Sequence, residues 1–240
     1  MKNNTLIVYS HSSYSDVWVP FFAQSELFLK NYKKVIFTEE EPTNIPDGWN
    51  YITYSSDMTY SQRMAHCLSK IDTDLFFYHH EDMFLYEKPN LELLTEYENL
   101  ILNSDIDFIR LLRSTDHPMF SYGKYKTLFP IPDYSQYYFS VQPTICKTSK
   151  ILKVFQETHI NHLREFETKV QNVCKKNNIK GLFHYDNENK RGLSHYDSNV
   201  YPYIATAVVK GKWNFREYKK ELIDILSKLN IDYSKRGIYD

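Results

Sequence analysis

The chain has 240 residues, 42% of them hydrophobic and 25% charged, which is enough apolar material for one α/β domain with a buried core. Its 29 basic residues nearly balance its 30 acidic ones, so the composition predicts no basic surface for nucleic-acid phosphates. No apolar run approaches the roughly 20 residues needed to cross a bilayer, and we expect no membrane span.

The first half of the chain alternates strand-like and helix-like segments. Short apolar runs predict strands over 5–9, 33–37, 50–54, 75–78 and 108–112. Apolar residues at helical spacing predict helices over 18–30, 59–71 and 91–102. This alternation is typical of an α/β protein with a mostly parallel, doubly wound central sheet flanked by helices.

The second half is less regular. Residues 115–140 contain three prolines and many tyrosines, and we expect irregular structure with a hairpin over the active face. Helices are predicted over 147–158, 163–178 and 215–230. Asn214 is expected to cap the last of these, with Glu217 three residues further on.

The three cysteines are widely spaced and form no CxxC pair: Cys67, Cys146 and Cys174. An odd and scattered set argues against a disulfide framework or a zinc site. The first residues also lack a signal-peptide pattern. We therefore expect reduced, partly buried thiols in a cytoplasmic protein.

An acidic pair, Glu81-Asp82, follows a buried predicted strand and two histidines, His79 and His80. Ligands of open α/β sheets bind beyond the carboxyl ends of the strands. Carboxylates at that position can hold Mg²⁺ or Mn²⁺, which bridges to phosphate oxygens and offsets the charge of a departing diphosphate. The alternative is that the pair merely begins a loop.

The segment His80-Glu81-Asp82 resembles the Asp-x-Asp metal motif of GT-A glycosyltransferases, with histidine in place of the first aspartate. Three other segments support the resemblance: Tyr9–Trp18, Arg191–Asp197 and Lys210–Asn214. In order and spacing, nearly the whole chain resembles the small GT-A glycosyltransferase domains of large DNA viruses, phages and bacteria, a group that includes the chlorovirus rhamnosyltransferase domain.

The resemblance implies a divalent cation, Mn²⁺ or Mg²⁺, with Asp82 as its main ligand. Glu81 would assist or contact the ribose, and His195 would complete the metal shell. An ordinary surface role is the alternative for His195. The histidine at His80 departs from the motif, which puts the first motif contact in doubt and suggests weaker metal dependence.

The resemblance also implies where the donor nucleotide binds. The segment Ser10-His11-Ser12 would lie at the base and ribose, and Asp57 would accept a hydrogen bond from one of them. Arg63 would reach the diphosphate, because a planar guanidinium suits phosphate oxygens, unless it lies on a solvated helix face. Arg191 belongs to a segment expected to close over the phosphates.

An inverting transfer needs a carboxylate base near the acceptor hydroxyl. The resemblance points to Glu167 for this role, with Asp197 as the second choice. Glu165 is two residues away and would point in another direction on a helix. A favourable interaction with the helix dipole accounts equally well for an acidic residue at that position. The acceptor would lie across Tyr134–Phe139 and Gln142, since aromatic rings stack on sugars.

These expectations combine into one GT-A domain over 1–240, with a Rossmann-like nucleotide-sugar-binding half (1–112) and an acceptor-binding half (113–240). Its activity would be metal-dependent, inverting transfer of a sugar from an NDP-sugar to a glycan or glycoconjugate. UDP is the usual nucleotide of this fold, and the viral relative suggests UDP-rhamnose. The alternatives are a non-catalytic nucleotide- or carbohydrate-binding module and a metal-dependent phosphohydrolase or nucleotidyltransferase.

Overall fold

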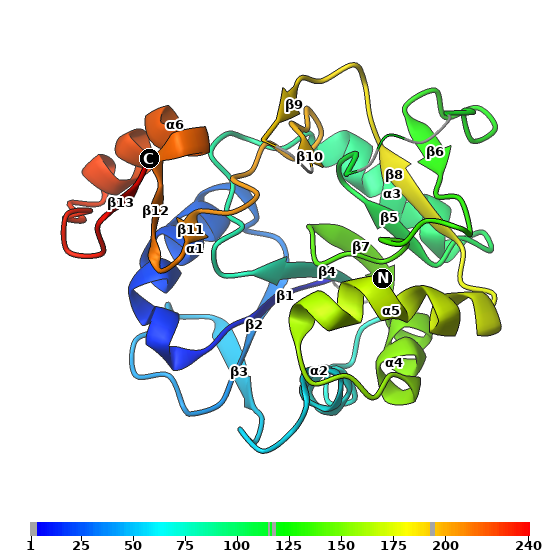
Figure 1. Ribbon diagram of the computed structural model, residues 1–240, viewed down its shortest axis with the longest axis horizontal. Helices are drawn as coiled ribbons and strands as arrows, with labels where there is room; N and C mark the ends of the chain where they lie inside the picture. The colour runs from blue at the N-terminus through cyan, green and yellow to red at the C-terminus, as the bar shows by residue number, and fades with distance from the viewer. Residues whose placement is uncertain (1–3, 115, 117–118, 193–194) are drawn as a thin grey trace.

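The computed structural model describes residues 4–114, 116, 119–192 and 195–240. Its largest element is an eight-stranded sheet in the order β3-β2-β1-β4-β7-β5-β8-β6 (Figure 1). The strands of this sheet are β1 (Thr5–Tyr9), β2 (Lys33–Thr38), β3 (Trp49–Thr53), β4 (Leu75–His80), β5 (Phe108–Arg110), β6 (Leu128–Pro130), β7 (Thr144–Lys147) and β8 (Gly181–His184).

Four of the seven strand pairs are parallel, and the three antiparallel pairs all involve β6 or β7. Strands β1 to β5 and β8 therefore run in one direction. Their carboxyl ends meet along one edge of the sheet, which we call the carboxyl edge. In parallel sheets this is the edge at which ligands bind.

Alternate residues of the strands face opposite sides of the sheet and belong to two separate apolar clusters. Leu6 and Val8 contribute to one cluster, and Ile7 contributes to the other. Helices α1 (Ser15–Phe28), α3 (Leu91–Leu102) and α6 (Phe215–Lys228) cover the first, and α2 (Tyr60–Leu68), α4 (Thr148–Glu157) and α5 (Leu163–Lys176) cover the second. The sheet is thus a central layer with helices on both faces (Figure 1).

Side-chain caps fix the start of three helices. Thr59 and Gln62 form a reciprocal capping box at α2, and Asn90 accepts a hydrogen bond from the backbone of Leu93 in α3. Asn214 accepts from the backbone N–H of Glu217, which confirms the predicted cap of α6.

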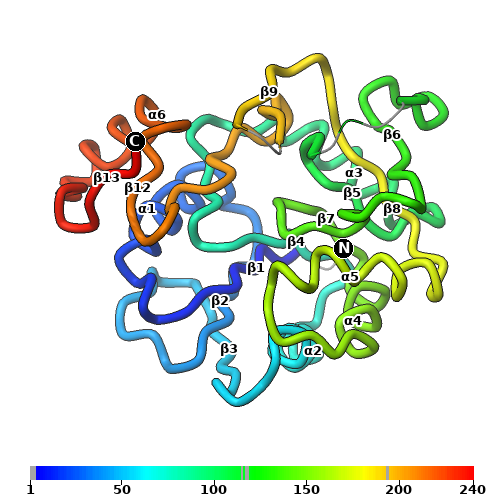
Figure 2. The backbone as a smooth tube through the Cα atoms, viewed as in Figure 1, coloured from blue at the N-terminus to red at the C-terminus, as the bar shows by residue number. Residues whose placement is uncertain are grey.

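Two small sheets lie in the C-terminal part of the chain. One pairs β9 (Lys190–Arg191) with β10 (His195–Tyr196), and the other joins β11 (Val208–Val209), β12 (Lys212–Asn214) and β13 (Ile238–Tyr239). Figure 2 shows the C-terminal segment, in red, close to α1. Arg236 attaches it there, since its Nε donates to Asp16 over 2.7 Å.

The structure confirms the five predicted strands and the six predicted helices, with shifted ends. Helix α1 begins at Ser15 instead of residue 18, because the short 3₁₀ helix η1 (Ser12–Tyr14) leads directly into it. Leu27, one of the apolar residues of this helix, is 59% exposed. The segment 115–140 is largely irregular in its described residues, but it also contributes β6, which pairs with β8 and covers one end of the sheet.

All three cysteines are buried free thiols, as the sequence predicts. No described helix combines the length and the apolar character required to cross a membrane.

Candidate functional site

The acidic pair stands where the sequence places it, directly after β4 at the carboxyl edge. Glu81 is only 8% exposed, and one of its oxygens, Oε2, is buried without a hydrogen-bond partner. Burial raises the pKa of both carboxyls above their ordinary values, and the Asp82 charge raises that of Glu81 further. Hydrogen bonds from the Ser10 side chain to Glu81 and from the Val208 backbone to Asp82 only partly oppose this rise.

Two adjacent carboxylates, Glu81 buried and Asp82 half-buried, repel each other and are costly to ionise without a counter-charge. A divalent cation supplies that charge, and its preferred ligands are oxygens such as the unpartnered Glu81 Oε2. The chemistry of Glu81 and Asp82 therefore fits a bound Mn²⁺ or Mg²⁺. Perturbed carboxyls at a ligand-binding edge are also a typical mark of a functional site.

The expected third ligand does not join this pair. Among the described residues, no three or more His, Cys, Asp or Glu side chains form a group able to hold a metal ion. His195 Nε2 lies 2.6 Å from the hydroxyl of Tyr218 in α6, and its ring stacks on that of Tyr218. His195 is therefore not placed as a third ligand beside Glu81 and Asp82.

The two histidines before the pair have different surroundings. His79 is fully buried, burial lowers its pKa to about 3, and its Nε2 lies 2.8 Å from the Tyr201 hydroxyl. His80 is half-buried, and burial lowers its pKa to about 4, so it is neutral at pH 7. The Nε2 atom of His80 lies 2.6 Å from the Tyr78 hydroxyl, which bonds in turn to Tyr60.

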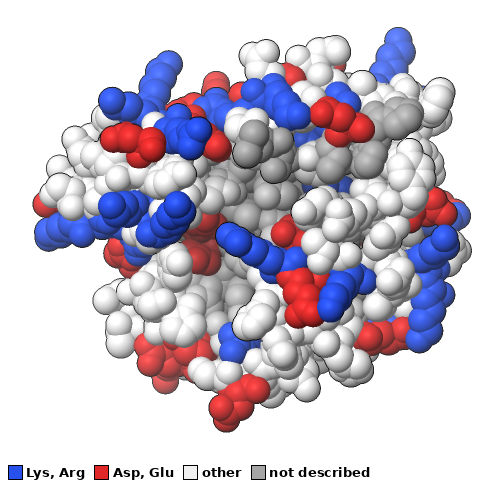
Figure 3. Space-filling view, viewed as in Figure 1, with Lys and Arg blue, Asp and Glu red and all other residues white. Residues whose placement is uncertain are grey.

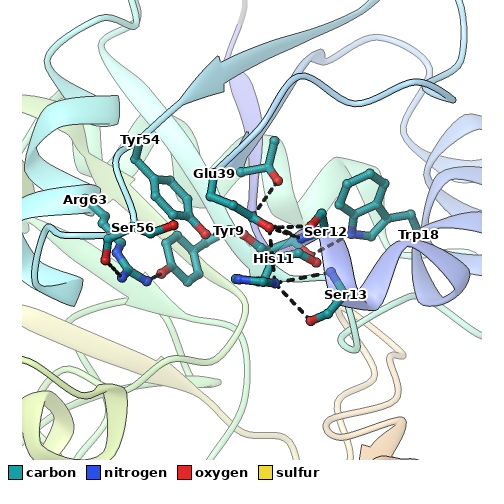
Figure 4. A network of polar contacts seen from close by, with 11 residues as sticks. Tyr9, His11, Ser12, Ser13, Trp18, Glu39, Tyr54, Ser56 and Arg63 are labelled. Atoms are coloured by element: carbon teal, nitrogen blue, oxygen red, sulfur yellow. Dashed lines mark hydrogen bonds and ion pairs between the residues drawn. The ribbon is translucent and has the colours of Figure 1, made fainter.

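The loop after β1 is held in one conformation by Glu39, which follows β2. Both carboxylate oxygens of Glu39 accept from the backbone N–H of Ser12, at 2.9 and 3.0 Å (Figure 4). These bonds lower the pKa of Glu39, although its partial burial opposes them. Ser10, at the start of the loop, accepts a 2.6 Å hydrogen bond from Trp18 Nε1. The loop predicted to contact the nucleoside is therefore rigid.

An aromatic cluster lies beside this loop. The rings of Tyr9 and Tyr54 are stacked with centroids 5.4 Å apart, and the His80 ring lies 5.4 Å from that of Tyr9. Arg63 contacts both tyrosines, since its Nη1 donates to the Tyr9 hydroxyl over 3.3 Å and its guanidinium lies over the Tyr54 ring (Figure 4). The cluster thus offers partly exposed aromatic rings, those of Tyr9 and His80, with the cation of Arg63 next to Tyr9.

Two other predicted donor contacts are exposed. His11 lies at the surface, with Nδ1 3.2 Å from a Glu39 oxygen. Asp57 is also exposed, and its backbone N–H donates to Ser55 Oγ over 3.3 Å.

The predicted base, Glu167, lies on α5 and points towards the sheet. Its Oε1 accepts a 2.9 Å hydrogen bond from the backbone N–H of Val141, and burial raises its pKa despite this bond and the nearby Arg110 charge. Its carboxylate is also one of the charges that add to the strongly raised pKa values of the buried phenols Tyr60 and Tyr78. This places Glu167 close to the chain of side chains that leads to His80. Its neighbour Glu165 instead forms an outward ion pair with Lys169.

Arg191, His195 and Asp197 come together, but against α6 and not around the acidic pair. Arg191 binds Asp197 through Nε at 2.7 Å and Nη2 at 3.2 Å, and its Nη1 binds Glu221 at 2.9 Å. Its guanidinium also lies over the ring of Tyr218. These contacts occupy the donors of Arg191, and they pair the carboxylate of Asp197 with a cation.

The tyrosine-rich segment predicted at the acceptor divides into exposed and buried residues. Tyr134 and Tyr137 are 65% and 39% exposed, whereas Tyr138 and Phe139 belong to the core. The Gln142 side chain accepts from the Tyr203 hydroxyl. Two rings of the segment are thus accessible to solvent, whereas Tyr138 and Phe139 pack in the core.

Three residues near these sites were not identified from the sequence. The sequence did carry a signal for Glu39, because this residue begins an acidic run two positions after a predicted strand. The sequence carried no signal for the position of Arg110. This residue is 98% buried at the end of β5, where Nη1 donates to Ser140 Oγ over 3.1 Å. Arg236 is distant in sequence, yet its charge acts on Glu81.

The space-filling view shows the molecule hollowed near the middle of one face, with Lys and Arg atoms on both sides of the hollow (Figure 3). In the same view of Figure 1, this hollow lies between β12 and α5. Cations at the rim of a hollow attract anionic ligands.

No protein-family model and no curated protein sequence matches this chain. Several solved structures are similar to it in fold. S. aureus TarS (residues 1–349) aligns with 98% of this chain and 68% of its own, at 10% identity and a TM-score of 0.50. Bifunctional IspDF from Campylobacter jejuni (80% of this chain, 15% identity) and a cytidylyltransferase from Leptospira borgpetersenii (100% of both chains, 16% identity) each have a TM-score of 0.47.

The chain spans only 52% of the length of IspDF. At these identities the likeness to TarS shows the fold alone. Together with the sheet order and the helices on both faces, it confirms the α/β class with a large, mostly parallel central sheet.

Proposed function

We propose that this protein is a metal-dependent glycosyltransferase that moves a sugar from a nucleoside-diphosphate sugar, UDP-linked in the first instance, to a glycan acceptor. The observation that carries the proposal is the adjacent pair Glu81–Asp82 at the carboxyl edge, in which the buried Glu81 Oε2 has no hydrogen-bond partner. The pair would hold Mn²⁺ or Mg²⁺ against the diphosphate. When bound, the ion supplies positive charge that stabilises the leaving diphosphate.

The neighbouring groups suit the rest of such a donor. The rings of Tyr9 and His80 offer a surface against which a nucleobase can pack, and Arg63 supplies a cation next to them. The fixed loop Ser10–Ser12 supplies polar groups for the ribose. We assign the nucleoside to this cluster and the diphosphate to the acidic pair.

Glu167 is our choice for the base of an inverting transfer. The acceptor oxygen attacks the anomeric carbon as the bond from that carbon to the diphosphate oxygen breaks, and Glu167 takes the acceptor's proton. The raised pKa of Glu167 makes its carboxylate a stronger base than that of an ordinary glutamate. Asp197 is a weaker choice than Glu167, because Arg191 already pairs with its carboxylate.

The test is isothermal titration of the protein with UDP, GDP, CDP and dTDP, each with and without Mn²⁺. We expect one nucleotide to bind in a Mn²⁺-dependent manner, and Asp82→Asn to abolish that dependence. Asp224→Asn, which removes an exposed carboxylate from α6, is the matched control and should bind as the unmodified protein does. The proposal fails if no nucleotide binds, or if Asp82→Asn binds with unchanged metal dependence.

A further inference from the structure

A second group of side chains occupies the carboxyl edge at its other end, around Arg113. This residue follows β5, and its guanidinium lies against two aromatic rings that contact each other edge to face, 4.8 Å from the centroid of Tyr185 and 4.7 Å from that of Tyr196. Tyr185 directly follows β8, and Tyr196 belongs to β10. Lys190, in β9, lies 5.6 Å from the Tyr196 centroid. We call Arg113, Tyr185, Lys190 and Tyr196 the Arg113 cluster.

The Arg113 cluster holds one carboxylate, that of Asp116. Arg113 Nη2 lies 3.3 Å from Oδ1, and Lys190 Nζ lies 3.1 Å from Oδ2. The Tyr196 hydroxyl donates to Oδ1 as well. Each oxygen thus has its own donor, and the cluster matches the planar shape and the charge of a carboxylate.

Asp116 is the more exposed partner in this arrangement, since its side chain is 60% exposed whereas that of Arg113 is 12% exposed. The Lys190–Asp116 pair is exposed on both sides, and such pairs contribute only about 0–1 kcal/mol, so a ligand carboxylate can compete for Lys190 at small cost. A ligand in the place of Asp116 would lie against two cations, Arg113 and Lys190, and beside two tyrosine rings. Cations next to aromatic faces suit a ligand that has both an anionic group and the apolar face of a sugar ring.

We propose that the Arg113 cluster binds the carboxylate of an acidic sugar, a uronic acid, in the acceptor glycan, and that this carboxylate displaces Asp116. The proposal rests on the function proposed above. It adds the chemical class of the acceptor, which neither the fold nor the acidic pair specifies.

The position of the cluster fits a sugar some distance from the reaction. Strand β8 lies three strands from β4 in the sheet, which corresponds to about 14 Å at the usual strand spacing. The acidic sugar bound by the Arg113 cluster would therefore be a different unit of the glycan from the one that receives the transferred sugar. Recognition at such a distance selects the glycan without contacting the reacting atoms.

The experiment compares methyl β-D-glucuronoside with its neutral counterpart, methyl β-D-glucoside, by NMR titration of the full chain. We expect the glucuronoside to bind about fivefold more tightly or better, and Arg113→Gln to remove the difference. Asp116→Asn should bind the glucuronoside more tightly than the unmodified protein, because the competing carboxylate is gone. Lys150→Gln, which removes an exposed cation from α4, is the control and should change nothing.

Equal binding of the two glycosides, or unchanged glucuronoside binding in Asp116→Asn, would overturn the proposal. Tighter binding of glucose 6-phosphate than of the glucuronoside would also overturn it, because the cluster would then be a phosphate site. The Mn²⁺–nucleotide titration on the same samples separates the two proposals. Nucleotide binding without selectivity for the glucuronoside would support the proposed transferase function and refute only the proposal that the acceptor contains an acidic sugar.

Discussion

The Tyr78 hydroxyl lies 2.6 Å from Nε2 of His80, the residue at the position of the first aspartate in the motif that the segment resembles. This contact occupies one ring nitrogen. Burial keeps His80 neutral, and its ring lies against Tyr9. The histidine therefore belongs with the aromatic cluster that we assign to the nucleoside, and we do not assign it to the metal.

The first prediction follows from this placement. We expect His80→Ala to weaken binding of the cognate nucleoside diphosphate about tenfold, equivalent to about 1.4 kcal/mol, because the ligand loses a ring contact and a hydrogen-bonding nitrogen. Tyr78→Phe keeps the His80 ring and should bind the nucleotide within about twofold of the unmodified protein. Isothermal titration measures both. Unchanged affinity in His80→Ala would exclude a nucleoside contact.

The second prediction concerns the effect of the acidic pair on the stability of the metal-free protein. Because burial raises the pKa of Glu81, its folded form binds a proton more tightly than its unfolded form, so its contribution to stability is present at low pH and lost as pH rises through the raised pKa. Glu81→Gln should therefore raise the melting temperature of the metal-free protein at about pH 8 and have little effect at about pH 5. The same substitution should reduce the stabilisation by Mn²⁺ at pH 8.

Thermal unfolding in EDTA and in excess Mn²⁺, at both pH values, checks this. Asp224→Asn serves as the control, since its carboxylate is exposed and unrelated to the pair. A lower melting temperature for metal-free Glu81→Gln at pH 8 would mean that the charge of Glu81 stabilises the fold, contrary to our reading of its burial.

Arg191 provides the third prediction. Its donors bind Asp197 and Glu221, and we therefore expect a structural role, in which it attaches the β9–β10 hairpin to α6. Arg191→Ala should lower the free energy of unfolding by about 1–3 kcal/mol, because two partly buried carboxylates lose their partner. Lys228→Ala breaks an exposed pair in α6 and should cost less than about 0.5 kcal/mol.

Urea unfolding measures these costs, and nucleotide titration decides between the two roles. A structural Arg191 leaves nucleotide affinity unchanged in Arg191→Ala under conditions where the variant is folded. A loss of about tenfold or more in affinity would instead support the phosphate-closing role that the resemblance implies.

The strands and helices of the first half could be predicted because each carries its own periodic apolar pattern. Strands β7 and β8 could not, since Thr144–Lys147 and Gly181–His184 are short and form only through pairing with distant segments. Strand β8 also depends on Gly181, where a Cβ atom would lie 2.1 Å from the ring of Phe108. No local sequence pattern predicts such a contact.

The same distinction applies to the site. The position of Glu81 and Asp82 at the carboxyl edge could be predicted because they follow a strand that the sequence marks clearly. The partners of Arg191 and His195 could not, because Glu221 and Tyr218 reach them only through the packing of α6. Nor does the sequence reveal that Arg236 lies close enough to act on Glu81.

The last prediction tests Glu167 as the base. Glu167→Gln keeps the shape of the side chain and can still accept the hydrogen bond from Val141, but it cannot take up a proton. With a cognate donor and acceptor, we expect kcat to fall about 10²- to 10⁴-fold while nucleotide affinity is retained. In the unmodified protein, kcat should rise with pH through the raised pKa of Glu167, because the base acts only when deprotonated.

Glu165→Gln is the matched control, since Glu165 lies two residues away on α5 and pairs with Lys169 at the surface. It should retain full activity and the same pH profile. If Glu167→Gln keeps both kcat and the pH dependence, Glu167 is not the base. Asp197→Asn would then be the next variant to assay, with urea unfolding to separate a loss of catalysis from the loss of its ion pair with Arg191.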